Sequence, residues 1–290
     1  MKAKCLYHSK NILGECPVWS VKEQALYWID IEINTIYILH IETNSFREIK
    51  LEHKIGSFAF TINDNEIVAA LDIGFAYVNL STKSISPIVN PLKNKTNMRF
   101  NDGKCDRKGR FWAGSLDNNF DKPVGVLYRL DNNETINNFK EAVICSNGIG
   151  WSPDNKTMYY TDSFRYCIYA YDFDIEMGTI TNERIFALDT DGSEPDGLTV
   201  DVEGFVWSVK WSTGRVVRYA PDGNIDQTIK LPVQQPTSCT FGGPAMNQLF
   251  ITSARMDLSA QQLLQQPLAG SVLVLETDTK GLEDSFFIKI

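Results

Sequence analysis

A short, apolar and aromatic-rich segment recurs six times along the 290 residues of the chain. The copies are LYWIDI, EIVAALD, RFWAGSL, TMYYTDS, GFVWSVK and QLFITSA, with first apolar residues Leu26, Ile67, Phe111, Met158, Phe205 and Leu249. Successive copies are therefore 41, 44, 47, 47 and 44 residues apart. Most copies are followed by a second strand-like segment after a turn rich in Asn, Asp and Gly, as antiparallel hairpins require. A repeat of this length with about four short strands is typical of a propeller blade.

The repeat predicts an all-β fold, a six-bladed β-propeller that spans residues 1–290 as a single domain, because no linker-like segment interrupts it. A β-sandwich or a pair of smaller β domains is the alternative, since even turn spacing occurs there too. We expect the N-terminal strand to close the last blade, with Lys2 to His8 pairing beside Phe286 to Ile290. One helix is expected over Leu258 to Gln266, capped by Asp257 or Ser259.

Composition excludes several classes of protein. A hydrophobic fraction of 43% and a charged fraction of 22% indicate a globular chain. The net charge of −8 argues against a nucleic-acid binder and against binding to an anionic membrane surface. No apolar run is long enough to span a bilayer, and the first residues lack the core of a signal peptide. We therefore expect a cytoplasmic protein whose six cysteines, with no C-x-x-C pair, are reduced and mostly buried.

A polar residue stands at the same phase of each repeat, about ten residues before the aromatic segment. In chain order these residues are Glu15, Ser57, Asn101, Asn147, Asp196 and Ser238. In a propeller this phase lies where the innermost strand begins, at the mouth of the central channel, and converging carboxylate and amide oxygens suit a hard divalent cation. Asn-Gly and Asp-Gly are also ordinary turn dipeptides, so each one taken alone is better read as a turn. The shared phase favours a site for one divalent cation, Ca²⁺, Zn²⁺, Mg²⁺ or Mn²⁺.

Other catalytic chemistries lack their residues. The chain has only three histidines and contains neither H-E-x-x-H nor G-x-S-x-G, so the zinc-protease and α/β-hydrolase mechanisms are not supported. No Gly-rich phosphate loop of the nucleotide-binding kinds is present. The expected ligand other than the cation is a small molecule.

Seven stretches of the chain resemble the SMP-30/gluconolactonase/regucalcin family, in the right order and over nearly the whole length. They are Leu13 to Trp19, Leu26 to Asp30, Arg99 to Lys104, Ser146 to Ser152, Pro195 to Gly197, Phe241 to Gly243 and Thr252 to Arg255. The resemblance implies a six-bladed propeller with one divalent cation in its channel and hydrolysis of a sugar lactone to the aldonic acid. Two departures are visible: Cys16 replaces a small residue, and the segment from Asp117 to Asp121 differs from the acidic pattern of animal members.

By the same resemblance, Glu15, Asn147 and Asp196 match the metal ligands, and Arg99 matches a substrate-binding position. Asn101 also matches a residue of the site, close to the metal or to the substrate, which it would bind. The assignment of Arg99 rests on the resemblance alone, whereas the repeat phase had already selected the other four residues. The cation would polarise the lactone, and Asp196 would act as the catalytic general base toward water.

Two other functions stay open at this point: a calcium-binding regulatory protein, and a hydrolase of another ester or of an organophosphate. The expected assembly is a monomer or a weak homo-oligomer.

Overall fold

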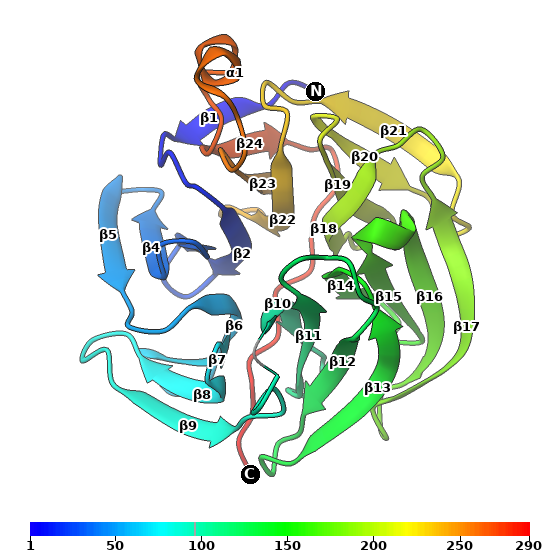
Figure 1. The fold of residues 1–290 in the computed structure, drawn as a ribbon. Coiled ribbons are helices and arrows are strands. Elements are labelled where there is room, and N and C mark those ends of the chain that lie inside the picture. The colour runs from blue at the N-terminus through cyan, green and yellow to red at the C-terminus, as the bar shows by residue number, and fades with distance from the viewer. Residues whose placement is uncertain (96) are drawn as a thin grey trace.

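The computed structural model, which describes residues 1–95 and 97–290, arranges six four-stranded antiparallel sheets around a central axis (Figure 1). In every sheet the strand order runs outward from the axis, and the innermost strands pack against those of the neighbouring blades. The predicted six-bladed β-propeller is confirmed.

The blades are numbered along the chain, and each is given from its innermost strand outward. Blade 1 holds β2 (Gly14–Ser20), β3 (Ala25–Asp30), β4 (Thr35–His40) and β5 (Ser45–Lys50). Blade 2 holds β6 (Ile55–Phe60), β7 (Glu66–Leu71), β8 (Gly74–Asn79) and β9 (Ile85–Val89). Blade 3 holds β10 (Met98–Cys105), β11 (Phe111–Asp117), β12 (Gly125–Leu130) and β13 (Ile136–Val143). Blade 4 holds β14 (Ser146–Trp151), β15 (Thr157–Asp162), β16 (Cys167–Asp174) and β17 (Thr179–Leu188), with the 3-10 turn η1 (Ser163–Arg165) before β16. Blade 5 holds β18 (Glu194–Val200), β19 (Val206–Trp211), β20 (Arg215–Tyr219) and β21 (Ile225–Lys230). Blade 6 holds β22 (Pro236–Gly242), β23 (Gln248–Ser253), β24 (Val272–Glu276) and β1 (Lys4–Tyr7).

The recurring aromatic segment forms the second strand of each blade. This strand is covered on both faces by the neighbouring blades, which is why it reads as a continuous apolar run rather than an alternating one. The indole N–H of Trp112 donates to Asp106 and that of Trp207 to Asp201, both at 2.9 Å. The same Asp to Trp spacing in blades 3 and 5 is a structural trace of the repeat. Outer strands such as β5 are largely exposed.

The N-terminal strand closes the ring, as predicted, but its partner segment was predicted wrongly. β1 pairs antiparallel with β24, with Lys4 opposite Val274. Phe286–Ile290 does not lie beside it; instead Phe287 forms a parallel bridge with Thr61. The apolar run of β24 already provides the free edge that a closing strand needs, so the last residues of the chain are left for another role.

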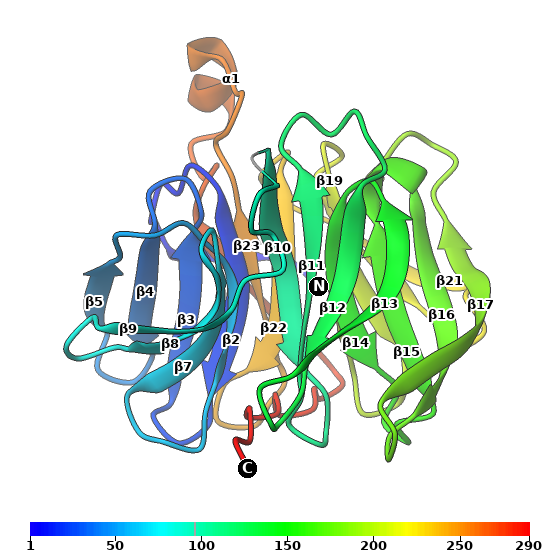
Figure 2. The ribbon, with the colours of Figure 1, turned by 60° about the horizontal axis from the view of Figure 1, so that its bottom comes forward.

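The C-terminal segment crosses one end of the central channel (Figures 1 and 2). Asp284 forms an ion pair with Lys104 at 2.7 Å and accepts a hydrogen bond from the Thr240 hydroxyl group at 3.3 Å. Further along, the Phe287 side chain is fully buried, and the backbone N–H of Ile288 donates to Gly109 O at 3.0 Å. The segment therefore covers the end of the channel opposite to Gly14, where the innermost strand of blade 1 begins.

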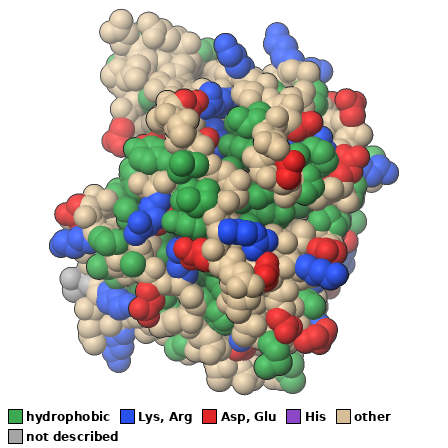
Figure 3. Space-filling view, turned by 90° about the vertical axis from the view of Figure 1, so that its right-hand side faces the viewer, with side chains coloured by type: hydrophobic (Ala, Val, Ile, Leu, Met, Phe, Trp, Pro, Cys, Tyr) green, Lys and Arg blue, Asp and Glu red, His purple; other side chains and the backbone are tan. Residues whose placement is uncertain are grey.

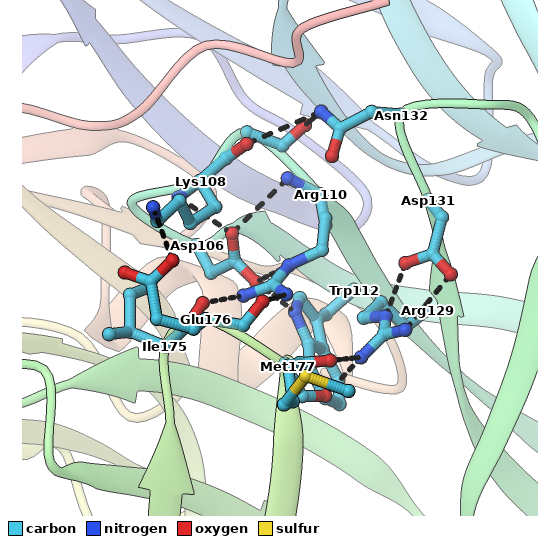
Figure 4. A network of polar contacts seen from close by, with 12 residues as sticks. Asp106, Lys108, Arg110, Trp112, Arg129, Asp131, Asn132, Ile175, Glu176 and Met177 are labelled. Atoms are coloured by element: carbon cyan, nitrogen blue, oxygen red, sulfur yellow. Dashed lines mark hydrogen bonds and ion pairs between the residues drawn. The ribbon is translucent and has the colours of Figure 1, made fainter. Parts of the chain in front are cut away.

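A polar network ties blade 3 to the β16–β17 hairpin of blade 4 (Figure 4). Asp106 accepts from Arg110 Nε at 2.7 Å and so orients the guanidinium, whose Nη2 donates to Ile175 O at 2.7 Å. Arg129 donates to the carbonyls of Met177, at 3.1 Å, and of Gly178. Two arginines thus satisfy the carbonyl groups of one hairpin tip.

The outer surface is mixed in charge. Figure 3 looks onto the side of the ring where β17 and β21 lie, and it shows basic and acidic side chains interspersed around apolar ones. Lys140 pairs with Glu183 at 2.6 Å, and Arg184 pairs with Asp172 at 2.8 Å. Surface pairs of this kind contribute about 0–1 kcal/mol each.

The one predicted helix is present. α1 (Ala260–Gln265) projects from the loop between β23 and β24, and Ser259 caps it through a capping box with Gln262 (Figure 2). Over the described residues, no helix has the length and apolarity that crossing a bilayer requires.

Candidate functional site

Each inner strand carries an irregularity in its pairing at the phase that the sequence had singled out. In blades 3, 4 and 5 two residues face one on the neighbouring strand, and the first of the two is Asn101, Asn147 or Asp196. Glu15 immediately precedes the corresponding pair, Cys16 and Pro17, in blade 1. A β-bulge re-aims the side chain that it carries. The Asn-Gly and Asp-Gly dipeptides are therefore bulges within strands and not turns between them.

In blades 4 and 5 glycine follows the bulged residue, because the inner strands approach closely there. A Cβ on Gly148 would lie 2.7 Å from Asp196 O, which is shorter than van der Waals contact allows. The glycine therefore brings the backbones that carry Asn147 and Asp196 together.

All five residues predicted for the site line one cavity of about 270 Å³ at the channel mouth. They are Glu15, Arg99, Asn101, Asn147 and Asp196. Ser57 and Ser238, the other two residues of the predicted ring, do not line it. Their side chains are short, and Gly103 and Gly197 of the adjacent inner strands pack against them. The structure thus brings together four of the six residues that the repeat phase had selected, plus Arg99.

The loops that lead into the site are anchored by buried carboxylates. Asp30, at the end of β3, accepts the backbone N–H groups of Ile12 at 2.7 Å and Leu13 at 3.2 Å. Asp162, at the end of β15, accepts those of Ile144 and Cys145 in the same way. These bonds fix the start of the strands that carry Glu15 and Asn147.

In blade 5 the loop before the innermost strand is anchored by a buried lysine instead of a carboxylate. The residue at the corresponding position is Lys210, which lies opposite Pro195. Its ammonium group pairs with Asp189 Oδ2 at 2.6 Å, and Asp189 belongs to the loop that leads to β18. The strand that carries Asp196 is therefore positioned by a buried ion pair.

A chain of hydrogen bonds orients the amide groups. Arg99 Nη1 donates to Phe100 O at 3.1 Å and to Asn101 Oδ1. Asn101 Nδ2 donates to Ser146 O at 2.8 Å and to Asn147 Oδ1. Asn147 Nδ2 in turn donates to Ser163 Oγ at 2.7 Å. Ser163, which sequence reasoning missed, completes the chain by donating to Pro195 O at 2.6 Å.

The carboxyl groups of the site are poorly compensated. Glu15 is 3% exposed and Asp196 is 6% exposed, and burial raises the pKa of both well above the usual range. The charges of Asp196 and Asp102 raise the pKa of Glu15 further, while Arg99 opposes them. Burial also raises the pKa of Asp102, to about 7. These carboxyl groups resist ionisation, and a bound cation would favour their ionised form.

Oxygen atoms for such a cation are present. Asp196 Oδ1 is buried and has no hydrogen-bond partner within residues 1–95 and 97–290. Within the described residues, the Glu15 carboxyl group accepts one hydrogen bond, from the backbone N–H of Cys16 to Oε2 at 3.1 Å. No group of three His, Cys, Asp or Glu side chains that could hold a metal ion occurs in the described chain. A third protein ligand beside Glu15 and Asp196 would thus be an amide oxygen, such as that of Asn147.

The cavity also has an apolar wall that the sequence did not reveal. Phe120, Phe164, Trp211 and Met256 line it. They lie in loops, in η1 or at a strand end, outside the phase at which the repeat aligns. The one available signal was the Asp117 to Asp121 segment, which contains Phe120 and departs from the family pattern.

Comparison with known proteins identifies relatives along nearly the whole chain. A family model described as SMP-30/Gluconolactonase/LRE-like region matches residues 13–255. A 6-deoxy-6-sulfogluconolactonase of Pseudomonas putida is 35% identical over 286 residues, covering 98% of each chain. Regucalcin of Danio rerio is 35% identical over 274 residues, covering 93% of this chain and 92% of its own.

Solved structures agree in fold. A luciferin-regenerating enzyme superposes with a TM-score of 0.92 at 26% identity and covers 99% of both chains. A calcium-binding regucalcin from Agrobacterium tumefaciens gives a TM-score of 0.94 at 24% identity, covering 98% of this chain and 96% of its own. The second likeness concerns the fold alone.

Proposed function

Because the chain belongs to the SMP-30/gluconolactonase/LRE-like family, we propose that it hydrolyses a sugar lactone of the gluconolactone type to the aldonic acid. The reaction depends on one divalent cation at the channel mouth. The observation that carries the proposal is the pair of buried acids, Glu15 and Asp196, in one cavity, with Asp196 Oδ1 lacking a hydrogen-bond donor in the described chain.

The residues present fit a hard cation. Two carboxylates and the amide oxygen of Asn147 form an all-oxygen donor set, which suits Ca²⁺, Mg²⁺ or Mn²⁺ and also admits Zn²⁺. Glu15, Asn147 and Asp196 would hold the ion. When bound, the cation would polarise the lactone carbonyl group as a Lewis acid.

Asp196 is the proposed general base. Its carboxylate accepts a proton from water as the water oxygen forms a bond to the lactone carbonyl carbon. The bond between that carbon and the ring oxygen then breaks, and the ring oxygen takes up the proton as the new hydroxyl group. One lactone molecule and one water molecule thus give one molecule of aldonic acid. Burial of Asp196 favours this role because it raises the basicity of the carboxylate.

Arg99 and Asn101 position the substrate. The bonds from Arg99 Nη1 to Phe100 O and Asn101 Oδ1 fix the plane of the guanidinium group at the floor of the cavity. A guanidinium held in this way presents its remaining N–H groups in a defined direction, which suits a carbonyl or hydroxyl oxygen.

A lactone assay with a pH indicator tests the proposal. We expect turnover of D-glucono-1,5-lactone above the uncatalysed rate, loss of turnover with a chelator, and recovery with one of the four ions. Asp196→Asn should lower kcat by roughly 10²–10⁴-fold, whereas Asp278→Asn, an exposed carboxylate, serves as the matched control.

Calorimetric titration of the ion separates the alternatives. Glu15→Gln should weaken ion binding as well as turnover. Ion binding without turnover of any lactone would favour the calcium-binding alternative. Turnover that is unaffected by both the chelator and Asp196→Asn would refute the proposed mechanism.

A further inference from the structure

The cavity has two chemically different halves. Its floor carries the polar groups described above, and its wall is apolar. Four successive blades contribute one side chain each to the wall: Phe120 from the β11–β12 loop, Phe164 from η1, Trp211 from the end of β19, and Met256 from the loop after β23.

Trp211 and Met256 pack against the edge of a buried apolar cluster, whereas Phe120 and Phe164 belong to none of the core clusters of the described residues. Phe164 is 37% exposed, and the Phe120 and Phe164 rings lie with their centroids 5.2 Å apart at a tilt of 57°. Partly exposed aromatic rings that converge on a cavity are typical of ligand sites, where the ligand completes their burial.

Hydrogen bonds within the β11–β12 loop fix the position of Phe120. The residue adopts a φ of +55°, which is unfavourable for a bulky side chain, and its N–H donates to Asp117 O at 2.9 Å. Asp117 is held in turn by Asn97 Nδ2 at 2.7 Å and by the N–H of Asn119 at 3.3 Å. The loop therefore holds the ring against the cavity in spite of the backbone conformation.

Two further carboxyl groups line the cavity. Glu194 and Asp257 line it, and neither Lys nor His is among its described lining residues. Arg99 is the one cationic side chain there, and it lies beside Asn101 at the floor, where two acceptors already engage its Nη1. An anionic substituent at the end of the lactone remote from Arg99 would face these carboxylates and lose hydration without gaining a cationic partner.

We infer that this site selects neutral lactones whose end remote from the carbonyl group presents C–H or apolar surface, and that it rejects lactones with an anionic substituent there. This specificity rests on the proposed lactonase function and refines it. A cavity of about 270 Å³ fits a small ligand, since pockets for drug-sized molecules measure about 300–1,000 Å³. The sulfonated substrate in the name of the Pseudomonas putida relative is therefore not the substrate of this chain.

Three lactones that differ only at C6 test the inference: 6-deoxyglucono-1,5-lactone with a methyl group, the parent D-glucono-1,5-lactone, and 6-deoxy-6-sulfoglucono-1,5-lactone. On the wild-type protein with its cation, we expect kcat/KM for the sulfonated lactone to be at least tenfold lower than for the two neutral lactones. The 6-deoxy lactone should be hydrolysed at least as well as the parent.

Variants show whether the discrimination comes from the apolar wall or from the carboxyl groups of Glu194 and Asp257. Glu194→Gln combined with Asp257→Asn should raise the ratio of sulfonated to parent kcat/KM at least fivefold, while Asp278→Asn, at the opposite end of blade 6, should leave that ratio unchanged. Phe164→Ala should raise KM for the 6-deoxy lactone more than for the sulfonated one.

The outcomes distinguish this inference from the proposed function. Equal or preferred turnover of the sulfonated lactone by the wild-type protein would overturn the inference and leave lactonase activity standing. An unchanged ratio in the Glu194 and Asp257 double variant would also overturn it. Failure to hydrolyse any of the three lactones would overturn both.

Discussion

Replacement of Lys210 by methionine is expected to lower the free energy of unfolding by about 3–5 kcal/mol, the usual consequence of removing one partner of a buried ion pair. Lys210 is fully buried, and its ammonium group lies 2.6 Å from Asp189 Oδ2 and 5.0 Å from the centre of the Tyr219 ring. Methionine preserves most of the volume but leaves the Asp189 side chain, which is 9% exposed, with the Tyr219 hydroxyl group at 3.2 Å as its one remaining hydrogen-bond donor in the described part of the chain.

The double variant Lys210→Met, Asp189→Asn separates the lost pair from the unpaired charge. Because the asparagine carries no charge, the double variant should be destabilised less than the sum of the two single variants, by at least about 1 kcal/mol. At about 1.4 kcal/mol per factor of ten, the single Lys210→Met change corresponds to roughly two to four orders of magnitude in the folding equilibrium.

Urea unfolding followed by tryptophan fluorescence measures these differences. Lys230→Met, at an exposed position at the end of β21, is the matched control and should change stability by less than about 0.5 kcal/mol. A loss below about 1 kcal/mol for Lys210→Met, or strictly additive single variants, would refute the reasoning that the buried pair positions the start of β18.

Three further outcomes follow from the structure. Gly178→Ala should destabilise the protein by about 1–3 kcal/mol more than Gly192→Ala in thermal unfolding, because both glycines have positive φ but only Gly178 packs against two arginine side chains; equal losses would contradict this. In the chelated protein, stability should fall as pH rises from about 4 to about 7, since burial raises the pKa of Asp102 to about 7 while the unfolded chain releases that proton near pH 3.9. Asp102→Asn should flatten this slope in urea titrations at several pH values, and an unchanged slope would exclude Asp102 as its source. Phe287→Ala should cost about 3–5 kcal/mol because its ring is fully buried, whereas Phe286→Ala, at 40% exposure, should cost much less; similar losses would argue against a packed C-terminal segment.

The blades could be predicted because burial on both faces leaves a readable pattern. Strands such as β3 and β11 are entirely buried, so their apolar and aromatic residues recur at the blade period. The closing partner of β1 could not be predicted in the same way. Both Val272–Glu276 and Phe286–Ile290 read as short apolar strands, and the choice between them depends on which one has a free edge after the ring is formed.

The floor of the candidate site was visible in the sequence, whereas its wall was not. Bulges recur at one phase of the repeat, so Asn101, Asn147 and Asp196 align with one another. Phe120 and Trp211 reach the cavity from the end regions of blades 3 and 5, and no periodicity connects them. Their convergence is a property of the assembled ring.

The covering of one channel end by the C-terminal segment has a kinetic consequence. With Asp284 and Phe287 packed across that end, an incoming lactone and an outgoing aldonate share a single opening. Hydrolysis creates a carboxylate next to the proposed cation site, so departure of the acid competes directly with arrival of the next lactone. The enzyme should therefore show competitive inhibition by its own product, and turnover in a progress curve should slow well before the substrate is exhausted.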